Sequence, residues 1–396
     1  MKITAVISEF DPFHNGHKYL IDCLRESGST HIISIMSGNF TQRGQAAMFD
    51  KYTRTKAALA CGADLVSELP VSFACSGAER FAYGGVFIAD SFGCVDTLAF
   101  GSECGDIDLL KNAADAVTDR SADKVIRDLL GSGMTFAAAR EQAVRKLYGS
   151  VPADVLSSPN NILAVEYIKA LRHINSIIRP ETIKRTGAEH DSNETVGNIA
   201  SASYIRSLYE SGDQGTVSFL PENVRVLYSD PENRPPLYGR QKKTEMMMLY
   251  RLRTMSAADF AALPDVSEGL ENRLYDAVRS SECVEEIILR TKSKRYTRSR
   301  IMRILTSAFL GMTKDSIPSK PLYIRVLGMN SKGTEVLRIA KKTAVLPIVM
   351  RYSDTYADPE AKKMYEFESL CDDIYALSGD MVYPCGSYMT NKVIRV

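Results

Sequence analysis

Two histidines, His14 and His17, flank a glycine in the stretch EFDPFHNGH, which spans residues 9–17. The apolar, β-branched run at residues 3–7 predicts a buried strand before them, and apolar residues at helical spacing predict a helix after them. Free N–H groups at a helix N-terminus favour anions, and Gly16 lets a phosphate approach the backbone closely. Two imidazoles three residues apart can both reach that phosphate. The sequence therefore predicts a phosphate site at this junction.

A pair of histidines at this spacing also occurs in metal sites and on ordinary protein surfaces. The predicted strand before the pair, the helix after it and the glycine between the histidines all favour the phosphate site.

The strand–helix alternation continues to about residue 120. Further strands are predicted at residues 31–36, 64–69 and 95–100, with helices at 51–61 and 80–90. Such spacing implies right-handed crossovers and a parallel sheet, in which ligands bind outside the C-terminal strand ends. Glycine-containing loops follow three of the predicted strands, at residues 9–17, 37–44 and 101–103. We therefore expect the site at this edge of the sheet.

The next stretch, residues 106–175, is predicted to be largely helical, followed by a strand-like run at 177–183. Asn160 and Asn161 precede one of these helices, where they can cap it or hold an adenine or a ribose. The residues alone favour the cap.

A second candidate phosphate-binding element is SASYIR, residues 201–206. Ser201 and Ser203 lie at the start of a predicted helix, where hydroxyl and N–H groups can bind a pyrophosphate, and Arg206 adds a planar fork of donors. A serine-capped helix with a solvated arginine is the alternative interpretation.

Together the two motifs resemble the HxGH and ISSTxIR elements of the HIGH-type nucleotidylyltransferases, in the expected order and about 185 residues apart. Over most of the chain the sequence resembles one family in that superfamily, the bacterial tRNA(Met) cytidine acetate ligases. The supporting stretches are EFDPFHNGH, MSGNFTQRG, DKYTRTKAAL, GADLVSELP, AFGSE, SPNNILAVEYIKAL, TIKRTGA with its Gly187, and SASYIR. Ser8 and Asp11 depart from residues often found in relatives, and the resemblance is weakest over residues 350–396.

The resemblance implies a reaction in two steps. Acetate attacks the α-phosphate of ATP to give acetyl-adenylate and pyrophosphate, and the acetyl group then passes to N4 of the wobble cytidine of elongator tRNA(Met), giving N4-acetylcytidine. A carboxylate is already an anionic nucleophile, so the first step needs positioning and charge stabilisation rather than a base. Mg²⁺ is expected on the nucleotide phosphates, without an evident protein ligand.

The resemblance also implies roles for individual residues. His14 and His17 are the expected catalytic residues. The expected ATP-binding residues are Ile7, Ser8, Glu9, Phe10, Asp11, Pro12, Phe13, Asn15, Gly16, Lys18, Tyr19, Leu20, Gly101, Asn160, Asn161, Arg185, Ser201, Ser203 and Arg206.

The C-terminal half has a different pattern. After a proline-marked joint at Pro231, Pro235 and Pro236, the chain is predicted to be helical from residue 241 to about 311. The predicted architecture is α/β: a Rossmann-like parallel sheet of the HIGH-type nucleotidylyltransferase fold in residues 1–220, then a mainly helical, tRNA-binding domain in residues 221–396.

A dense basic run lies between residues 290 and 303, with seven Lys or Arg and no acid, and contains Tyr296. Such a run is usually a solvated face, but its density suits an RNA backbone with a splayed base stacked on the aromatic ring. The expected RNA-binding residues are Lys294, Arg295, Arg298 and Arg300. Arg338, Lys341 and Lys342 can extend this surface or simply face water.

Composition sets broader limits. The 396 residues carry a net charge of +1, which argues against a uniformly basic nucleic-acid-binding protein and leaves room for a local basic patch. Eight cysteines without a CxxC pair predict free thiols and a cytoplasmic location. No signal peptide and no apolar run of about 18 residues is present, so no membrane association is expected.

Two other functions remain open on the sequence alone. One is a nucleotidylyltransferase acting on a small phosphorylated metabolite, which has no need of a basic helical half. The other is an RNA-binding protein that binds ATP without catalysis, which intact histidines and an intact SASYIR disfavour. Nothing in the residues selects acetate over formate or propionate. The residues also do not indicate how the anticodon is recognised or what the oligomeric state is.

Overall fold

The structure is a computed structural model that describes residues 1–185, 195, 197–230, 233, 240–267, 269–379, 382 and 384–396. Gly187 of the TIKRTGA stretch and the proline joint at Pro231, Pro235 and Pro236 lie outside these residues.

An eight-stranded sheet forms the centre of the molecule, with the order β5-β4-β1-β2-β3-β6-β7 and with β8 paired to β6. Its first five strands are β1 (Ile3–Ser8), β2 (His31–Ser37), β3 (Leu65–Leu69), β4 (Thr97–Ser102) and β5 (Arg179–Lys184). These five are mutually parallel, which confirms the predicted parallel sheet. Their C-terminal ends therefore share one edge, with β1 near the middle.

Helices cover both faces of the sheet. Alternate residues of β1 face opposite sides, so Ile3, Ala5 and Ile7 join one core cluster and Val6 joins another. The first cluster packs against α4 (Ala78–Ser91), α9 (Pro159–His173) and α17 (Ser331–Thr343). The second packs against α1 (Asn15–Glu26), α2 (Lys51–Ala60), α10 (Ala202–Ser211) and α11 (Glu222–Ser229).

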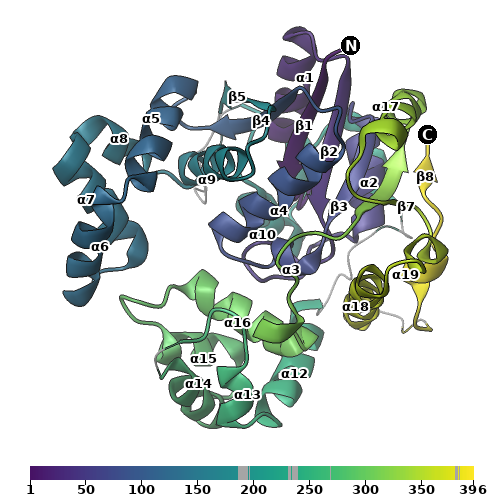
Figure 1. The fold of residues 1–396 in the computed structure, drawn as a ribbon. Coiled ribbons are helices and arrows are strands. Elements are labelled where there is room, and N and C mark those ends of the chain that lie inside the picture. Colours follow the sequence, from purple (N-terminus) through teal and green to yellow (C-terminus); the bar gives the residue numbers. More distant parts are fainter. Residues whose placement is uncertain are drawn as a thin grey trace.

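Two groups of helices project from this layered unit (Figure 1). One consists of α5 (Ile107–Thr118), α6 (Ser121–Gly131), α7 (Phe136–Tyr148) and α8 (Ser150–Val155). The other, which we call the helical lobe, consists of α12 (Arg240–Arg253), α13 (Ala257–Ala261), α14 (Leu270–Arg279), α15 (Val284–Thr291) and α16 (Arg298–Leu310). It has its own apolar core and confirms the helices predicted from residue 241 to about 311.

After the helical lobe the chain returns to the sheet. β6 (Ile324–Met329) runs antiparallel to β3, and β7 (Ile348–Val349) and β8 (Ile394–Arg395) pair with β6. Residues 221–396 were expected to form a mainly helical domain, whereas three of their strands complete the sheet of residues 1–220. A separate RNA-binding unit stays a prediction, and its candidate is now the helical lobe alone.

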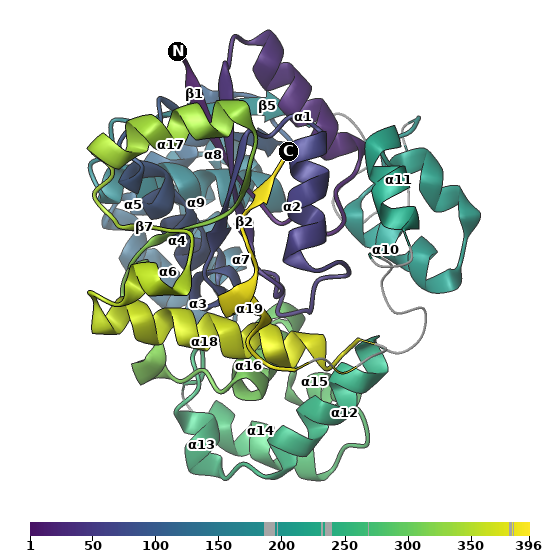
Figure 2. The ribbon, with the colours of Figure 1, turned by 90° about the vertical axis from the view of Figure 1, so that its right-hand side faces the viewer.

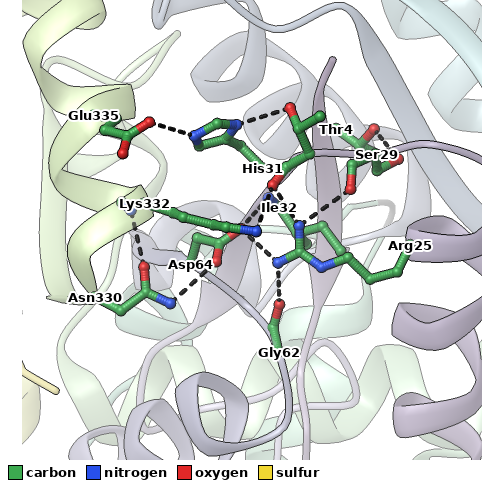
Figure 3. A network of polar contacts seen from close by, with 12 residues as sticks. Thr4, Arg25, Ser29, His31, Ile32, Gly62, Asp64, Asn330, Lys332 and Glu335 are labelled. Carbon is green, nitrogen blue, oxygen red and sulfur yellow. Dashed lines mark hydrogen bonds and ion pairs between the residues drawn. The ribbon is translucent and has the colours of Figure 1, made fainter. Parts of the chain in front are cut away.

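A polar network holds this returning segment at the N-terminal edge of the sheet (Figure 3). The buried Asp64 carboxylate accepts hydrogen bonds from Arg25 of α1 at 2.6 Å and from Asn330, next to α17, at 3.0 Å. His31 at the start of β2 lies 3.2 Å from the Glu335 carboxylate of α17. Side chains from both ends of the sequence thus fix this edge, which lies opposite the edge where the site is predicted.

Two α-helices of the C-terminal segment, α18 (Pro359–Ala376) and α19 (Ser387–Thr390), lie beside the sheet above the helical lobe (Figure 2). Within the described residues, no helix combines the length and the apolar character that crossing a membrane requires.

Candidate functional site

The loop after β1 leads directly into α1, and His14 is the N-cap of that helix. The His14 Nδ1 accepts a hydrogen bond from the Gly16 N–H at 3.0 Å, and the His17 Nδ1 accepts one from the His14 N–H at 3.3 Å. Their ring centroids are 3.8 Å apart. Because both Nδ1 atoms accept, each neutral ring carries its proton on Nε2 and offers one N–H donor.

The pKa values of both imidazoles are lowered. Burial, and after it the nearby charges of Arg185 and Arg206, together lower the pKa of His14 from 6.5 to about 3. Burial, His14 and Arg185 lower the pKa of His17 well below its usual value. Both rings are therefore neutral donors at neutral pH, and an anion bound beside them would raise these pKa values.

Gly16 is required by the position of His14. A Cβ at Gly16 would lie 2.9 Å from the His14 Cε1 and 3.1 Å from its Nδ1. Any larger residue would displace the ring from the helix N-terminus. The glycine predicted to admit a phosphate thus also makes room for the histidine itself.

Two arginines from distant parts of the sequence flank this helix N-terminus. Arg185 follows β5, and its side chain crosses Gly101, whose Cβ would lie 3.2 Å from the Arg185 Cγ. Arg206 of α10 donates to the Asp11 main-chain oxygen at 2.5 Å. Since both charges act on His14, the structure brings together residues 14–17, Gly101, Arg185 and Arg206.

The start of α10 is tied to the start of α1. Ser201 is the N-cap of α10, accepting from the Tyr204 N–H at 3.1 Å, with the Ser203 hydroxyl 3.0 Å away. The Asn15 amide donates to the Asn198 carbonyl at 2.8 Å and to the Ser218 carbonyl at 3.1 Å. Asn15 thus holds the two motifs side by side.

Other predicted site residues in the first loop support its shape. Phe10 and Phe13 are buried and pack against the His17 ring at centroid distances of 4.9 and 5.5 Å. The Asp11 carboxylate accepts from the Met48 N–H at 2.7 Å, and Pro12 is buried beside it.

The remaining residues of this stretch differ in exposure. Ile7 is in the core, and the Ser8 hydroxyl lies 2.8 Å from that of Ser34. On α1, Lys18 pairs with Asp22, Tyr19 is exposed and Leu20 packs on the core around α2.

Asn160 and Asn161 were interpreted as a helix cap, and this is wrong in detail. They lie within the first turn of α9, whose N-cap is Ser158. The Glu103 carboxylate accepts from the Asn160 amide at 2.6 Å and from the Asn161 N–H at 2.8 Å. The Asn161 oxygen in turn accepts from the Glu103 N–H at 2.9 Å, so these side chains fasten the loop after β4 to α9.

Arg54 is a positioning residue that the sequence analysis did not assign. Its buried guanidinium donates to the Glu9 carbonyl at 2.5 Å, to the Ser37 carbonyl at 3.1 Å and to the Gly38 carbonyl. It thereby joins the loops that follow β1 and β2. A lone arginine in a helix is usually exposed, so the sequence carries no signal for this role.

No group of three or more His, Cys, Asp or Glu residues that could hold a metal is present in the part of the chain that the structure describes. The donor set at α1 suits phosphate oxygens instead.

The predicted RNA-binding residues lie around the start of α16. Lys294, Arg295 and Arg298 are exposed, with Arg298 paired to Glu285, while the half-buried Arg300 donates to the Asp265 carbonyl at 2.7 Å.

The stacking part of the RNA prediction is wrong, and of the two alternatives left open for Arg338, Lys341 and Lys342 the structure favours exposure to water. The Tyr296 side chain is only 8% exposed and packs in the core of the helical lobe, so it offers no stacking face. Arg338, Lys341 and Lys342 are on α17, at the other end of the molecule from the helical lobe, and do not extend its surface (Figure 2).

Comparisons with known proteins agree along the whole chain. The HIGH Nucleotidyl Transferase family matches residues 1–384. A tRNA(Met) cytidine acetate ligase of Thermoanaerobacter sp. (strain X514) is 41% identical over 386 residues, 96% of each chain. One from Clostridium perfringens (strain SM101 / Type A) is 37% identical over 410 residues, with both chains fully covered.

Two solved structures also match this chain over its full length. Crystal structures of Thermotoga maritima TmcAL, in an apo form and bound with alpha-thio ATP, match with TM-scores of 0.94 and 0.91. Both are 31% identical to this sequence and cover 100% of each chain.

Proposed function

Because the chain belongs to the tRNA(Met) cytidine acetate ligases, a family within the HIGH nucleotidyl transferases, we propose that it activates acetate with ATP and acetylates elongator tRNA(Met). The acetyl group goes to N4 of the wobble cytidine, by way of acetyl-adenylate. The observation that carries this proposal is the pair of neutral Nε2–H donors at the N-terminus of α1, flanked by Arg185 and Arg206.

In the first step an acetate oxygen attacks the α-phosphate and pyrophosphate leaves. Negative charge grows on the α-phosphate oxygens, and fixed donors in a water-poor site stabilise it. His14 and His17 act here as hydrogen-bond donors, and no base is needed because acetate is already ionised. Arg206 and the start of α10 bind the β- and γ-phosphates.

Mg²⁺, when it is bound with the nucleotide, neutralises the phosphate charge through the phosphate oxygens.

In the second step the cytidine amine attacks the acetyl carbonyl and AMP leaves. Lys294, Arg295, Arg298 and Arg300 bind the RNA backbone, bringing the anticodon loop to the edge of the sheet. Since the substrate is a tRNA and all eight cysteines are free thiols, we propose the cytoplasm as the site of action.

The test is one assay with purified protein, ATP and radiolabelled acetate, with and without bulk bacterial tRNA. Label in tRNA that depends on ATP supports the proposal. Absence of label together with absence of acetate-dependent pyrophosphate release contradicts it, and a screen of phosphorylated metabolites would then test the other nucleotidyl transferase function.

A further inference from the structure

The second step of the proposed reaction has a chemical requirement that the first lacks. The N4 amine has two protons and loses one when it becomes an amide, whereas AMP leaves as an anion that needs no proton. A group beside the acetyl-adenylate must therefore accept one proton.

The histidines are unsuited to this role. Each Nδ1 already accepts a main-chain N–H and each Nε2 holds a proton, so neither His14 nor His17 has a free lone pair.

Most carboxylates at this edge of the sheet are also occupied. One Asp11 oxygen accepts from the Met48 N–H at 2.7 Å and the other lies 3.7 Å from Arg206. Both Glu103 oxygens accept from the first turn of α9. Asp50 caps α2 through one oxygen and accepts from the Thr53 hydroxyl through the other.

Glu9 differs from these groups. It follows β1 directly and precedes the HxGH motif, and its side chain is half-buried. Its Oε1 accepts from the Gln42 N–H at 2.6 Å. Its Oε2 has no hydrogen-bond or ion-pair partner among the described residues, so one lone-pair-bearing oxygen remains open.

Two arginines hold the loop that runs from Glu9 to His14: Arg54 donates to the Glu9 carbonyl at 2.5 Å, and Arg206 donates to the Asp11 main-chain oxygen at 2.5 Å. Burial raises the pKa of Glu9, the Gln42 N–H lowers it, Asp11 raises it, and Arg206 and Arg54 lower it. Since Arg206 binds the loop between Glu9 and His14, the carboxylate and the proposed phosphate donors belong to the same loop after β1.

The loop that holds Glu9 also contacts the helical lobe. The Gly44 carbonyl accepts from the Thr306 hydroxyl of α16 at 2.5 Å, and a Cβ at Gly44 would lie only 2.7 Å from the Arg303 main-chain nitrogen. Both views place α16 on the side of the helical lobe that faces the sheet (Figures 1 and 2). The Glu9 carboxylate is thus fixed by a loop that lies between the nucleotide site and the proposed RNA surface.

We propose that Glu9 is the general base of the acetyl-transfer step. The inference rests on the proposed function. The N4 lone pair forms a C–N bond with the acetyl carbon, and Glu9 Oε2 takes one N4 proton. The bond between the acetyl carbon and the phosphate oxygen then breaks, and its electron pair stays on AMP. Solvent removes the proton from Glu9 after the product has left.

Glu9→Gln is the decisive variant, because the amide oxygen still accepts the Gln42 N–H while the basic oxygen is lost. In the full-length protein two rates are compared: acetate-dependent ATP–pyrophosphate exchange and single-turnover transfer of labelled acetyl from preformed acetyl-adenylate to tRNA. We expect transfer to fall at least about 100-fold and by at least about tenfold more than exchange, since a general base contributes on that order to one step only.

The pH profile supplies a second readout. A base must be ionised, so wild-type transfer should decline as the pH falls through the Glu9 pKa, which burial raises above 4.5. Glu9→Gln should lack this decline. Glu335→Gln makes the same chemical change at the opposite edge of the sheet and should keep the wild-type profile.

Equal losses of exchange and transfer in Glu9→Gln would overturn the inference and make Glu9 a nucleotide-binding residue only. Unchanged transfer would overturn it as well. If the wild-type protein itself fails to label tRNA, the proposed function is wrong and the inference falls with it. If the wild type labels tRNA and Glu9→Gln does so equally well, only the inference is wrong.

Discussion

His14 and His17 show how main-chain groups can select one protonation state of a side chain. Their Nδ1 atoms cap the first turn of α1, so the helix whose N-terminus is the proposed anion site also directs the Nε2 protons of both rings. Burial keeps both rings neutral, with Arg185 and Arg206 contributing at His14 and with His14 and Arg185 contributing at His17. Phosphate binding is therefore expected to be coupled to the charge state of these rings.

His14→Asn separates the two roles of this residue. Asparagine is a good N-cap, so the Gly16 N–H keeps an acceptor, but the Nε2 donor is lost. We expect acetate-dependent ATP–pyrophosphate exchange to fall by about 10²–10³, as for the loss of one oxyanion donor, with a thermal midpoint near that of the wild type. Exchange within threefold of wild type in a folded variant would remove His14 from the mechanism.

The same variant tests the lowered pKa. Between about 6.5 and about 3, the unfolded chain protonates His14 and the folded protein does not, so the free energy of unfolding falls as the pH falls. From about pH 7 to about pH 5 this one group accounts for a loss of about 2 kcal/mol. Urea unfolding at both pH values measures this loss of unfolding free energy, which should be smaller by that amount in His14→Asn than in the wild type. Equal losses in the variant and the wild type would contradict the buried, neutral ring.

At the scale of elements, the sequence pattern predicted the strands and helices whose formation depends on residues close together in the sequence. Hydrophobic runs and glycine stops placed β1, β2 and β3 within about a residue of their observed bounds, and the serine-rich start of α10 was recognised. The return of β6 to the sheet was missed, because pairing with β3 joins residues more than 250 positions apart and leaves no local mark.

Side-chain environments were harder to predict than elements. Tyr296 lies in a basic run yet points into the core of the helical lobe, and Arg54 lies in an ordinary helix yet is fully buried between two loops. In both cases tertiary packing decides the role. Of the predicted site residues, the structure brings Gly101, Arg185 and Arg206 together with residues 14–17 at one helix N-terminus, and the ligand contacts stay predictions.

The contact between the Gly44 loop and α16 is an element-scale prediction. Gly44 has a φ of +77° and meets the Arg303 backbone, whereas Gly28 has a φ of +88° with nothing within 4 Å of its Cβ position. Both alanine variants carry the cost of a positive φ, but only Gly44→Ala adds a backbone clash. We expect urea unfolding to show that Gly44→Ala lowers the free energy of unfolding by about 2 kcal/mol more than Gly28→Ala does. Equal losses in the two variants would mean that the loop and α16 separate freely.

At the scale of the whole molecule, the proposed RNA surface lies on the helical lobe and the proposed anion site lies at the sheet. The matched test replaces three exposed basic residues at each end of the molecule. The first variant carries alanine at Lys294, Arg295 and Arg298; the control carries it at Arg338, Lys341 and Lys342 of α17.

We expect the first triple variant to bind tRNA more weakly, with a salt dependence shallower by about one unit of slope for each phosphate that is no longer neutralised. Its pyrophosphate exchange should stay near the wild-type rate, and the α17 control should bind tRNA normally. Filter binding over a range of salt concentrations measures this. Equal weakening in both variants, or a loss of exchange in the first, would show that the RNA surface lies elsewhere.

The most direct test of the central claim is nucleoside mass spectrometry on elongator tRNA(Met) after incubation with the protein, ATP and isotopically labelled acetate. The account predicts labelled N4-acetylcytidine at the wobble position, and none when that cytidine is replaced by uridine, although acetyl-adenylate still forms. Unmodified tRNA alongside rapid adenylylation of a phosphorylated metabolite, or label that persists in the uridine-containing tRNA, would contradict it.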